Sequence, residues 1–205
     1  MIDLQNKPKE FCDLYALANP IPGASAKVPI LEAGPVVMTE SLVVNDYVAD
    51  AFPDSGLVPS SSADRACMRL FSELCGSSTF SYWGILRAKD DEEKFAAEVE
   101  KFTKNLINAN VFLEAKSAGG PFLFGEQFTL AECNTAPFLQ RACKVLPAFV
   151  NIDPLEICDE NGLTRLKTWI LAILARPSVK SIELSEEDTK EGVKKMLERF
   201  AAMVN

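Results

Sequence analysis

The sequence contains no histidine among its 205 residues. This absence excludes Ser-His-Asp and Cys-His catalysis, imidazole metal ligands and a histidine pH switch. There is also no Cys-x-x-Cys pair, so neither a zinc ribbon nor a dithiol redox motif is present. No apolar run approaches the roughly 20 residues of a membrane-spanning helix, and residues 1–7 lack the apolar run of a signal peptide. We therefore expect no metal, no membrane association and a cytoplasmic location.

Basic residues are also in short supply. The chain has 21 Lys and Arg against 29 Asp and Glu, which gives a formal net charge of −8. An acidic surface is poorly suited to neutralising phosphates, so we expect no nucleic-acid partner. The six cysteines are expected to be free thiols in a reducing compartment, most of them serving as small core side chains.

Two composition regimes divide the chain. Residues 1–52 mix short apolar runs with turn residues, whereas residues 63–205 carry apolar residues at helical spacing almost throughout. Residues 53–62 (PDSGLVPSSS) are rich in Pro, Gly and Ser and are typical of a linker. The pattern predicts an α+β protein, with a small mixed domain at 1–52 and an all-helical domain at 63–205.

The first domain is expected to contain two strands and two helices. A short strand is possible at 1–4, and the pattern predicts a helix at 9–15. Strands are predicted at 28–31 and 35–38, joined by a tight turn at Ala33-Gly34. Glu40-Ser41 opens a second helix that runs to about Ala51. Its buried side is expected to consist of Leu42, Val43, Tyr47 and Val48.

The second domain is predicted to be a helical bundle. A long helix is expected over 63–88, weakened and kinked near 76–79 by GSST. Further helices are predicted over 91–116, from 129 to about 146, over 163–175, and at the end of the chain around Val193, Met196, Leu197 and Phe200. Thr129 and Glu132 match a capping box, and we assign them to folding alone.

The residues with the clearest chemistry lie around Pro29 and Ser41. A peptide bond before proline can be cis, and the preceding main chain can pair with an extended peptide. The helix start at Ser41 offers a hydroxyl and free amides to a carboxylate, and the Glu40 carboxylate can receive an ammonium group. Such a combination suits a small zwitterionic peptide.

Five motifs in order resemble the cytosolic glutathione transferases, most closely the omega and lambda classes. They are IDLQNKP at 2–8, KVPIL at 27–31, Glu40-Ser41, FGEQFTLAE with PFL within 124–139, and RPSVK at 176–180. The resemblance covers nearly the whole chain. It implies a thioredoxin-like glutathione-binding domain followed by the family's all-helical domain.

The resemblance also implies roles for individual residues. Lys7 would bind the glycine carboxylate of glutathione, and Val28, next to a cis Pro29, would pair with its cysteinyl backbone. Glu40 and Ser41 would hold the γ-glutamyl end. The resemblance implies an enzyme, usually a homodimer, that takes glutathione as its co-substrate and needs no metal. It would transfer glutathione to small electrophiles or reduce disulfide substrates.

Family members begin with a strand and helix that carry the catalytic Cys, Ser or Tyr. Few residues precede the equivalent of their second strand here, so we expect this unit to be missing and leave the catalytic residue unknown. The alternative is a non-catalytic protein that binds glutathione or a hydrophobic ligand. A docking module is a third alternative, to which the acidic charge lends little support. Cys12 is a weak candidate thiol, expected to pack near Leu14 and Tyr15, and an acceptor pocket could involve Tyr82, Trp83 and Phe138.

Overall fold

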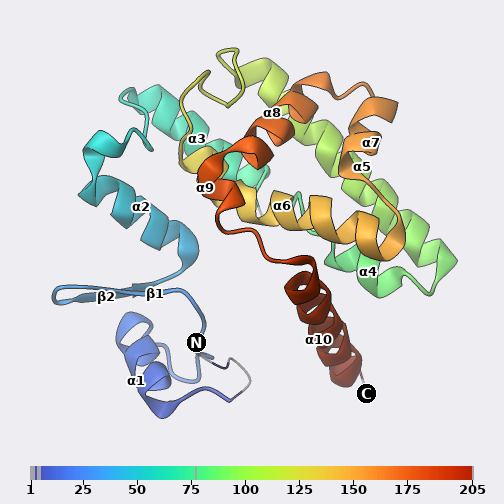
Figure 1. Ribbon diagram of the computed structural model, residues 1–205. Helices are drawn as coiled ribbons and strands as arrows, with labels where there is room; N and C mark the ends of the chain where they lie inside the picture. The colour runs from blue at the N-terminus through green and yellow to red at the C-terminus, as the bar shows by residue number, and fades with distance from the viewer. Residues whose placement is uncertain (1–2, 4–5, 77, 205) are drawn as a thin grey trace. The chain divides into compact units, whose positions relative to one another are not determined.

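The computed structural model describes residue 3, residues 6–76 and residues 78–204 (Figure 1). The chain forms two compact units, Met1–Val58 and Pro59–Asn205. The boundary between them falls inside the Pro-, Gly- and Ser-rich stretch 53–62. Apart from residue 3, the strand considered at 1–4 lies outside the described residues.

The first unit is built on an antiparallel hairpin of β1 (Ile30–Ala33) and β2 (Val36–Thr39). Ile30 lies opposite Thr39, and Ala33 lies opposite Val36. Gly34 has a φ of 60°, which suits the first central position of a type II′ turn, and Pro35 follows it. The first strand therefore begins two residues later than predicted, and the turn lies at 34–35 rather than 33–34.

Helix α1 (Lys9–Ala18) packs against this hairpin. Phe11 and Tyr15, one helical turn apart, are buried together with Ala26, and Ile30 of β1 packs on them. The Tyr15 hydroxyl also accepts a hydrogen bond from Nδ2 of Asn19 at 3.2 Å. Cys12, by contrast, is exposed, so the expectation that it packs with its neighbours is wrong. The helix buries only one side, and Cys12 is not on that side.

Helix α2 (Ser41–Ala51) forms as predicted, but its expected buried side is exposed. Leu42 is 48% exposed and Val43 54%, while Tyr47 and Val48 are each more than one third exposed. The helix contacts β2 and the short 3-10 helix η1 (Pro53–Ser55), and Ala49 is its buried residue. Periodicity predicts that a helix has an apolar face, but it does not show that another element covers that face.

The second unit is all-helical (Figure 1). Its helices are α3 (Ser62–Leu74), α4 (Trp83–Ala88), α5 (Glu92–Lys116), α6 (Leu130–Val150), α7 (Pro154–Glu160), α8 (Thr164–Ala175), α9 (Pro177–Lys180) and α10 (Glu186–Val204). Trp169 of α8 is fully buried at the centre, with ring centroids 5.4 Å from Phe71 and 6.0 Å from Phe80. Across 6–76 and 78–204, no helix has the length and apolarity needed to cross a membrane.

Three features of this unit differ from the predicted helices. Residues 63–88 form two helices instead of one kinked helix, and Thr79 Oγ1 donates to the Leu74 carbonyl at 3.3 Å beyond the end of α3. Helix α6 continues past Pro147 to Val150. Helix α7 was not predicted, although Asp153 caps it by accepting from the Leu155 amide at 2.8 Å.

The predicted capping box of α6 is confirmed and extends beyond its own helix. Oε2 of Glu132 accepts from the Thr129 amide at 2.9 Å, and Thr129 Oγ1 accepts from the Ala131 amide at 3.2 Å. The other carboxylate oxygen, Oε1, accepts from the Leu123 amide at 2.9 Å and from Nε1 of Trp169 at 3.1 Å. Glu132 therefore ties the start of α6 to the preceding loop and to α8.

A side chain of α5 supplies the cap for α8. The Leu163 side chain makes no capping bond, and Oδ1 of buried Asn110 accepts the Leu166 amide at 2.9 Å. We expect Asn110→Ala to lower the free energy of unfolding by about 1–3 kcal/mol, because this buried amide loses its acceptor. Asn108→Ala, at an exposed position of the same helix, should change it by no more than about 0.5 kcal/mol. Equal effects of the two variants in urea unfolding would contradict this assignment.

Candidate functional site

The open end of the hairpin brings together four of the five residues assigned to glutathione. In the register that pairs Ile30 with Thr39, Pro29 and Glu40 are the next positions outward. Thr39 Oγ1 donates to the Pro29 carbonyl at 2.9 Å and so holds this end closed. Val28 directly precedes Pro29, and Ser41 follows Glu40 as the first residue of α2. We refer to Lys7, Val28, Pro29, Glu40 and Ser41 as the hairpin site.

Val28 lies just before β1 and offers its main chain to a ligand. The Val28–Pro29 peptide is cis, as the resemblance implied. Within the described part of the chain, the amide and carbonyl of Val28 make no hydrogen bond, and its side chain is 53% exposed. An extended peptide can therefore use both main-chain groups, as in the addition of a strand.

Glu40 has an unusual backbone conformation between β2 and α2. Its φ of 69° and ψ of 117° place a residue other than glycine in a sparsely populated region, at a cost of about 1–3 kcal/mol. Its side chain makes no capping bond to α2. Strain of this kind gathers at ligand sites, where the surrounding structure holds a side chain in place. The exposed Glu40 carboxylate is thus held in place, although no described residue binds it in a way that accounts for its position.

Ser41 begins α2 and adds hydrogen-bond donors next to that carboxylate. The first amides of a helix lack partners within the helix and favour a negative group. No described residue bonds the Ser41 hydroxyl. The two neighbours therefore present opposite chemistries, a carboxylate for an ammonium group and donors for a carboxylate.

Lys7 is connected to the same loop through a hydroxyl. Its Nζ donates to Oγ of Ser25 at 3.1 Å, three residues before Val28. The side chain is half-buried, and no carboxylate among the described residues pairs with it. Lys7 therefore retains a positive charge that can bind a carboxylate.

The cysteines of the second unit are poor nucleophiles. Burial raises the pKa of Cys75, Cys133 and Cys158 to about 11 each, and that of Cys143 to about 12. Burial also raises the pKa of Cys67. These thiols stay protonated at neutral pH, whereas catalysis needs the thiolate. Among the described residues, no group of three or more Cys, Asp or Glu side chains is arranged to hold a metal ion.

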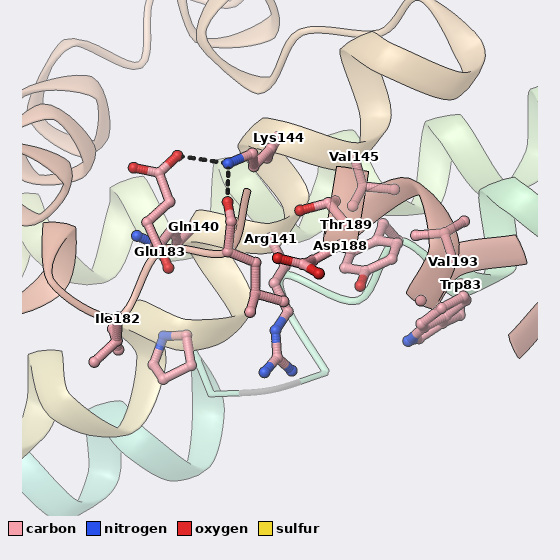
Figure 2. A pocket seen from close by; sticks show the side chains of 14 residues that line it. Trp83, Gln140, Arg141, Lys144, Val145, Ile182, Glu183, Asp188, Thr189 and Val193 are labelled. Carbon is pink, nitrogen blue, oxygen red and sulfur yellow. Dashed lines mark hydrogen bonds and ion pairs between the residues drawn. The ribbon is translucent and has the colours of Figure 1, made fainter. Parts of the chain in front are cut away.

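A pocket of about 260 Å³ lies in the second unit between the start of α4, α6 and the segment 182–193, and we call it the α6–α10 pocket (Figure 2). Its apolar walls include Trp83, Val145, Ile182, Leu184 and Val193. Tyr82 and Trp83 line it as expected. Phe138, the third aromatic residue considered for an acceptor pocket, does not line this one, and its neighbour Pro137 does.

Contacts from α6 and α4 hold the α10 side of this pocket. Nζ of Lys144 pairs with Oε1 of Glu183 at 2.8 Å and also donates to the Leu184 carbonyl (Figure 2). Farther along α10, the Phe200 ring lies 5.6 Å from the Trp83 ring, centroid to centroid. The Arg87 guanidinium lies 4.9 Å from the centre of the Phe200 ring. These contacts hold the segment that leads into α10 against α6, and the later part of α10 against α4.

The polar residues of the α6–α10 pocket were not predicted from the sequence. Gln140, Arg141 and Lys144 all come from α6, three, four and seven residues after Pro137, which lines the pocket with them. This is the spacing of one helical face, distinct from the buried face. This spacing is visible in the sequence, but a polar face on a helix of a bundle ordinarily faces solvent.

Comparisons with known proteins find glutathione transferases that are similar to this chain in sequence and in structure. Residues 96–172 match the family model described as glutathione S-transferase, C-terminal domain. The chain is 28% identical over 196 residues to glutathione S-transferase U13 of Arabidopsis thaliana, covering 95% of this chain and 71% of the relative. It is also similar to the crystal structure of glutathione transferase Omega 2C from Trametes versicolor, with a TM-score of 0.65 and 27% identity, covering 96% of this chain and 84% of that one.

A further structure, the Tau class glutathione S-transferase of mango (Mangifera indica), has the same fold. Its TM-score is 0.65 at 22% identity, and the match covers 92% of this chain and 83% of the other. The predicted fold class is confirmed: in this chain a small unit with a two-stranded sheet is followed by an all-helical unit, and the fold is similar to that of these glutathione transferases. Proteins of more than one class are similar to the chain, so the omega and lambda assignment stays a prediction.

Proposed function

We propose, from the similarity of the chain to glutathione transferases over most of its length, that it is a glutathione-dependent transferase or reductase of the omega or lambda type. Its substrates would be small electrophiles or disulfides. The observation that carries the proposal is the strained Glu40, an exposed carboxylate beside the free donors of Ser41 and the free main chain of Val28. This combination matches the ammonium, carboxylate and peptide groups of glutathione.

In this proposal each residue of the hairpin site binds one part of the tripeptide. The main chain of Val28, before Pro29, pairs with the cysteinyl residue in the manner of an added strand. Glu40 receives the γ-glutamyl ammonium group, and the Ser41 hydroxyl and amide bind its α-carboxylate. Lys7 binds the glycine carboxylate. Together these contacts fix the cysteinyl residue between two anchored ends.

The α6–α10 pocket is proposed as the site of the second substrate. Its apolar and aromatic walls suit a small organic molecule, and pockets of this kind commonly bind such ligands. Tyr82 and Trp83 contribute the aromatic surface. The group that activates the glutathione thiol is not assigned to any residue.

Two turnover assays test the proposal on the whole chain. Glutathione is supplied with an aryl chloride in one assay and with hydroxyethyl disulfide in the other. We expect turnover above the uncatalysed rate in at least one of them, and a loss of at least tenfold in kcat/KM for Glu40→Ala. Glutathione binding without turnover in either assay would contradict the enzyme and favour the non-catalytic binding protein.

We also propose a homodimer as the assembly. Leu70 and Leu74, one turn apart on α3, are 46% and 59% exposed, and Val111 of α5 is 56% exposed. A second copy would remove such surface from water. Light scattering at micromolar concentration should give twice the chain mass, and a monodisperse monomer would contradict the proposal.

The cellular setting proposed is the cytoplasm. All six cysteines are free thiols, as a reducing compartment requires. The partners proposed are glutathione and a small second substrate, and the net charge of −8 gives no support to a nucleic-acid partner.

A further inference from the structure

We propose that Ser185 is a phosphorylation site for an acidophilic protein kinase, one whose basic substrate groove binds carboxylates that follow the modified serine. Ser185 lies directly before α10, and the next three residues are Glu186, Glu187 and Asp188. The inference concerns a covalent modification of the chain and does not depend on glutathione or on a second substrate.

The carboxylates that follow Ser185 are open to a basic partner. Residues 181–188 are all exposed. Glu186 lies 3.8 Å from Nζ of Lys190, at the long end of the range for an ion pair. Among the described residues, no lysine or arginine pairs with Glu187 or Asp188. Because complementary charge selects the substrates of kinases, this acidic run favours a kinase with a basic groove.

The Ser185 hydroxyl can be released without unpacking the helical bundle. Its Oγ donates to Oδ2 of Asp188 at 2.6 Å and accepts from the Asp188 amide at 3.0 Å. Both bonds belong to the first turn of α10, and the hydroxyl has no other hydrogen-bond partner within the described chain. The ends of helices open at little cost in free energy, so the serine and the residues after it can enter a kinase groove in extended form.

The chain on both sides of this turn stays attached while the turn opens. Before Ser185, Nζ of Lys144 pairs with Oε1 of Glu183 at 2.8 Å and also donates to the Leu184 carbonyl. After it, Val193 is buried in the second unit. The part of the chain that must detach is therefore short, between residues 185 and 192, and it lies between two fixed points.

Other hydroxyl residues with a carboxylate three positions later do not offer the same site. The residues with this spacing are Ser61, Thr129 and Ser185. Thr129 is fully buried. Ser61 caps α3 by accepting from the Asp64 amide at 3.4 Å, but Arg65 follows Asp64, and its Nη1 donates to the carbonyl of residue 60 at 2.6 Å. This guanidinium beside Ser61 repels a basic groove, and no such group adjoins the acidic run at α10.

The modification is a phosphoryl transfer from magnesium ATP. Oγ of Ser185 attacks the γ-phosphorus, a new P–O bond forms, and the bond from that phosphorus to the bridging oxygen breaks, so that ADP leaves with the electron pair. The hydroxyl proton passes to the catalytic aspartate of the kinase. The product carries a charge of about −1.5 to −2 at neutral pH, and the serine oxygen has no proton left to donate to Asp188. Because Leu184 and Asp188 both line the α6–α10 pocket, the phosphate is attached to a wall of that pocket.

Treatment of the whole chain with purified casein kinase 2 and magnesium ATP tests the inference, with the modified residue mapped by mass spectrometry. We expect one phosphate per chain, on Ser185, and none on the Ser185→Ala variant. Asp188→Asn removes the carboxylate three positions after the serine and should lower kcat/KM at least tenfold. Glu198→Gln is the matched control, since Glu198 is an exposed carboxylate farther along α10, and kcat/KM should stay within twofold.

A synthetic peptide of residues 180–193 serves as the reference substrate. We expect the whole chain to be modified with a kcat/KM of at least one tenth of that of the peptide, because only the first turns of α10 must open. The inference would be overturned by phosphate on a residue other than Ser185, by equal rates for Asp188→Asn and the unmodified chain, or by a whole chain that is not modified. None of these results depends on glutathione binding or turnover, so failure here is distinguishable from failure of the proposed function.

Discussion

Replacing Glu40 with glycine is expected to weaken glutathione binding about tenfold to a hundredfold while relieving strain in the first unit. The variant removes a carboxylate whose charged hydrogen bond to the ligand contributes about 1.5–3 kcal/mol. Glycine adopts the φ of 69° without the penalty that glutamate incurs, so the strained backbone becomes an ordinary one. Binding and stability should therefore move in opposite directions, as measured by calorimetric titration of glutathione and by urea unfolding.

Glu40→Ala is the comparison that separates the two effects. Alanine also lacks the carboxylate but keeps the backbone penalty, so it should bind glutathione as weakly as the glycine variant. Its first unit should be about 1 kcal/mol less stable than that of the glycine variant. Glu32→Ala removes a carboxylate from β1, outside the hairpin site, and should bind normally. A Glu40→Gly variant that binds like the unmodified chain would contradict the assignment of this carboxylate.

Glu132→Ala is expected to produce the largest loss of stability in the second unit, about 3–5 kcal/mol. The carboxylate is fully buried and accepts from the Leu123 and Thr129 amides and from Nε1 of Trp169. Alanine would leave these donors, together with the Thr129 hydroxyl that donates to Oε2 at 3.0 Å, without this acceptor, at about 1–3 kcal/mol each before any relaxation. The midpoint of thermal unfolding should fall on the order of 10 °C, as followed by circular dichroism.

Two variants serve as controls for this buried network. Glu114→Ala removes an exposed carboxylate from α5 and should change stability by no more than about 0.5 kcal/mol. Trp169→Phe keeps most of the ring and removes one donor, so its cost should lie between the two. If Glu132→Ala unfolded within about 1 kcal/mol of the unmodified chain, the network would not have the role assigned to it.

Local signals predicted most of the helices, because the residues that start and stop a helix act over one turn. The Thr129 and Glu132 pair identified the start of α6 from the sequence alone. The same pattern could not show that Glu132 also binds Trp169, 37 residues away, since periodicity carries no information on distant partners. The start of α7 at Asp153-Pro154 also carries a local signal, a capping aspartate followed by a proline at the first helical position.

Burial was harder to predict than helix position. Leu42 and Val43 are apolar and at helical spacing, yet they are about half exposed, because helical spacing does not supply a covering element. In the same way, the resemblance assigned roles to Glu40 and Ser41 but could not reveal the positive φ of Glu40. Arg141 was not predicted as a pocket residue because an exposed arginine on a helix gives no sequence signal for a pocket, and only the fold brings it to the pocket that Tyr82 also lines.

The most direct test of the account is an NMR titration of glutathione into the isotope-labelled chain. We predict saturable shifts of the Val28 and Ser41 amide resonances, with a dissociation constant between the micromolar and millimolar range, or about −8 to −4 kcal/mol. Oxidised and reduced glutathione can be compared in the same samples. If the amides of the hairpin site do not shift with reduced glutathione in the millimolar range, or the shifts cluster elsewhere, the proposed glutathione site is contradicted.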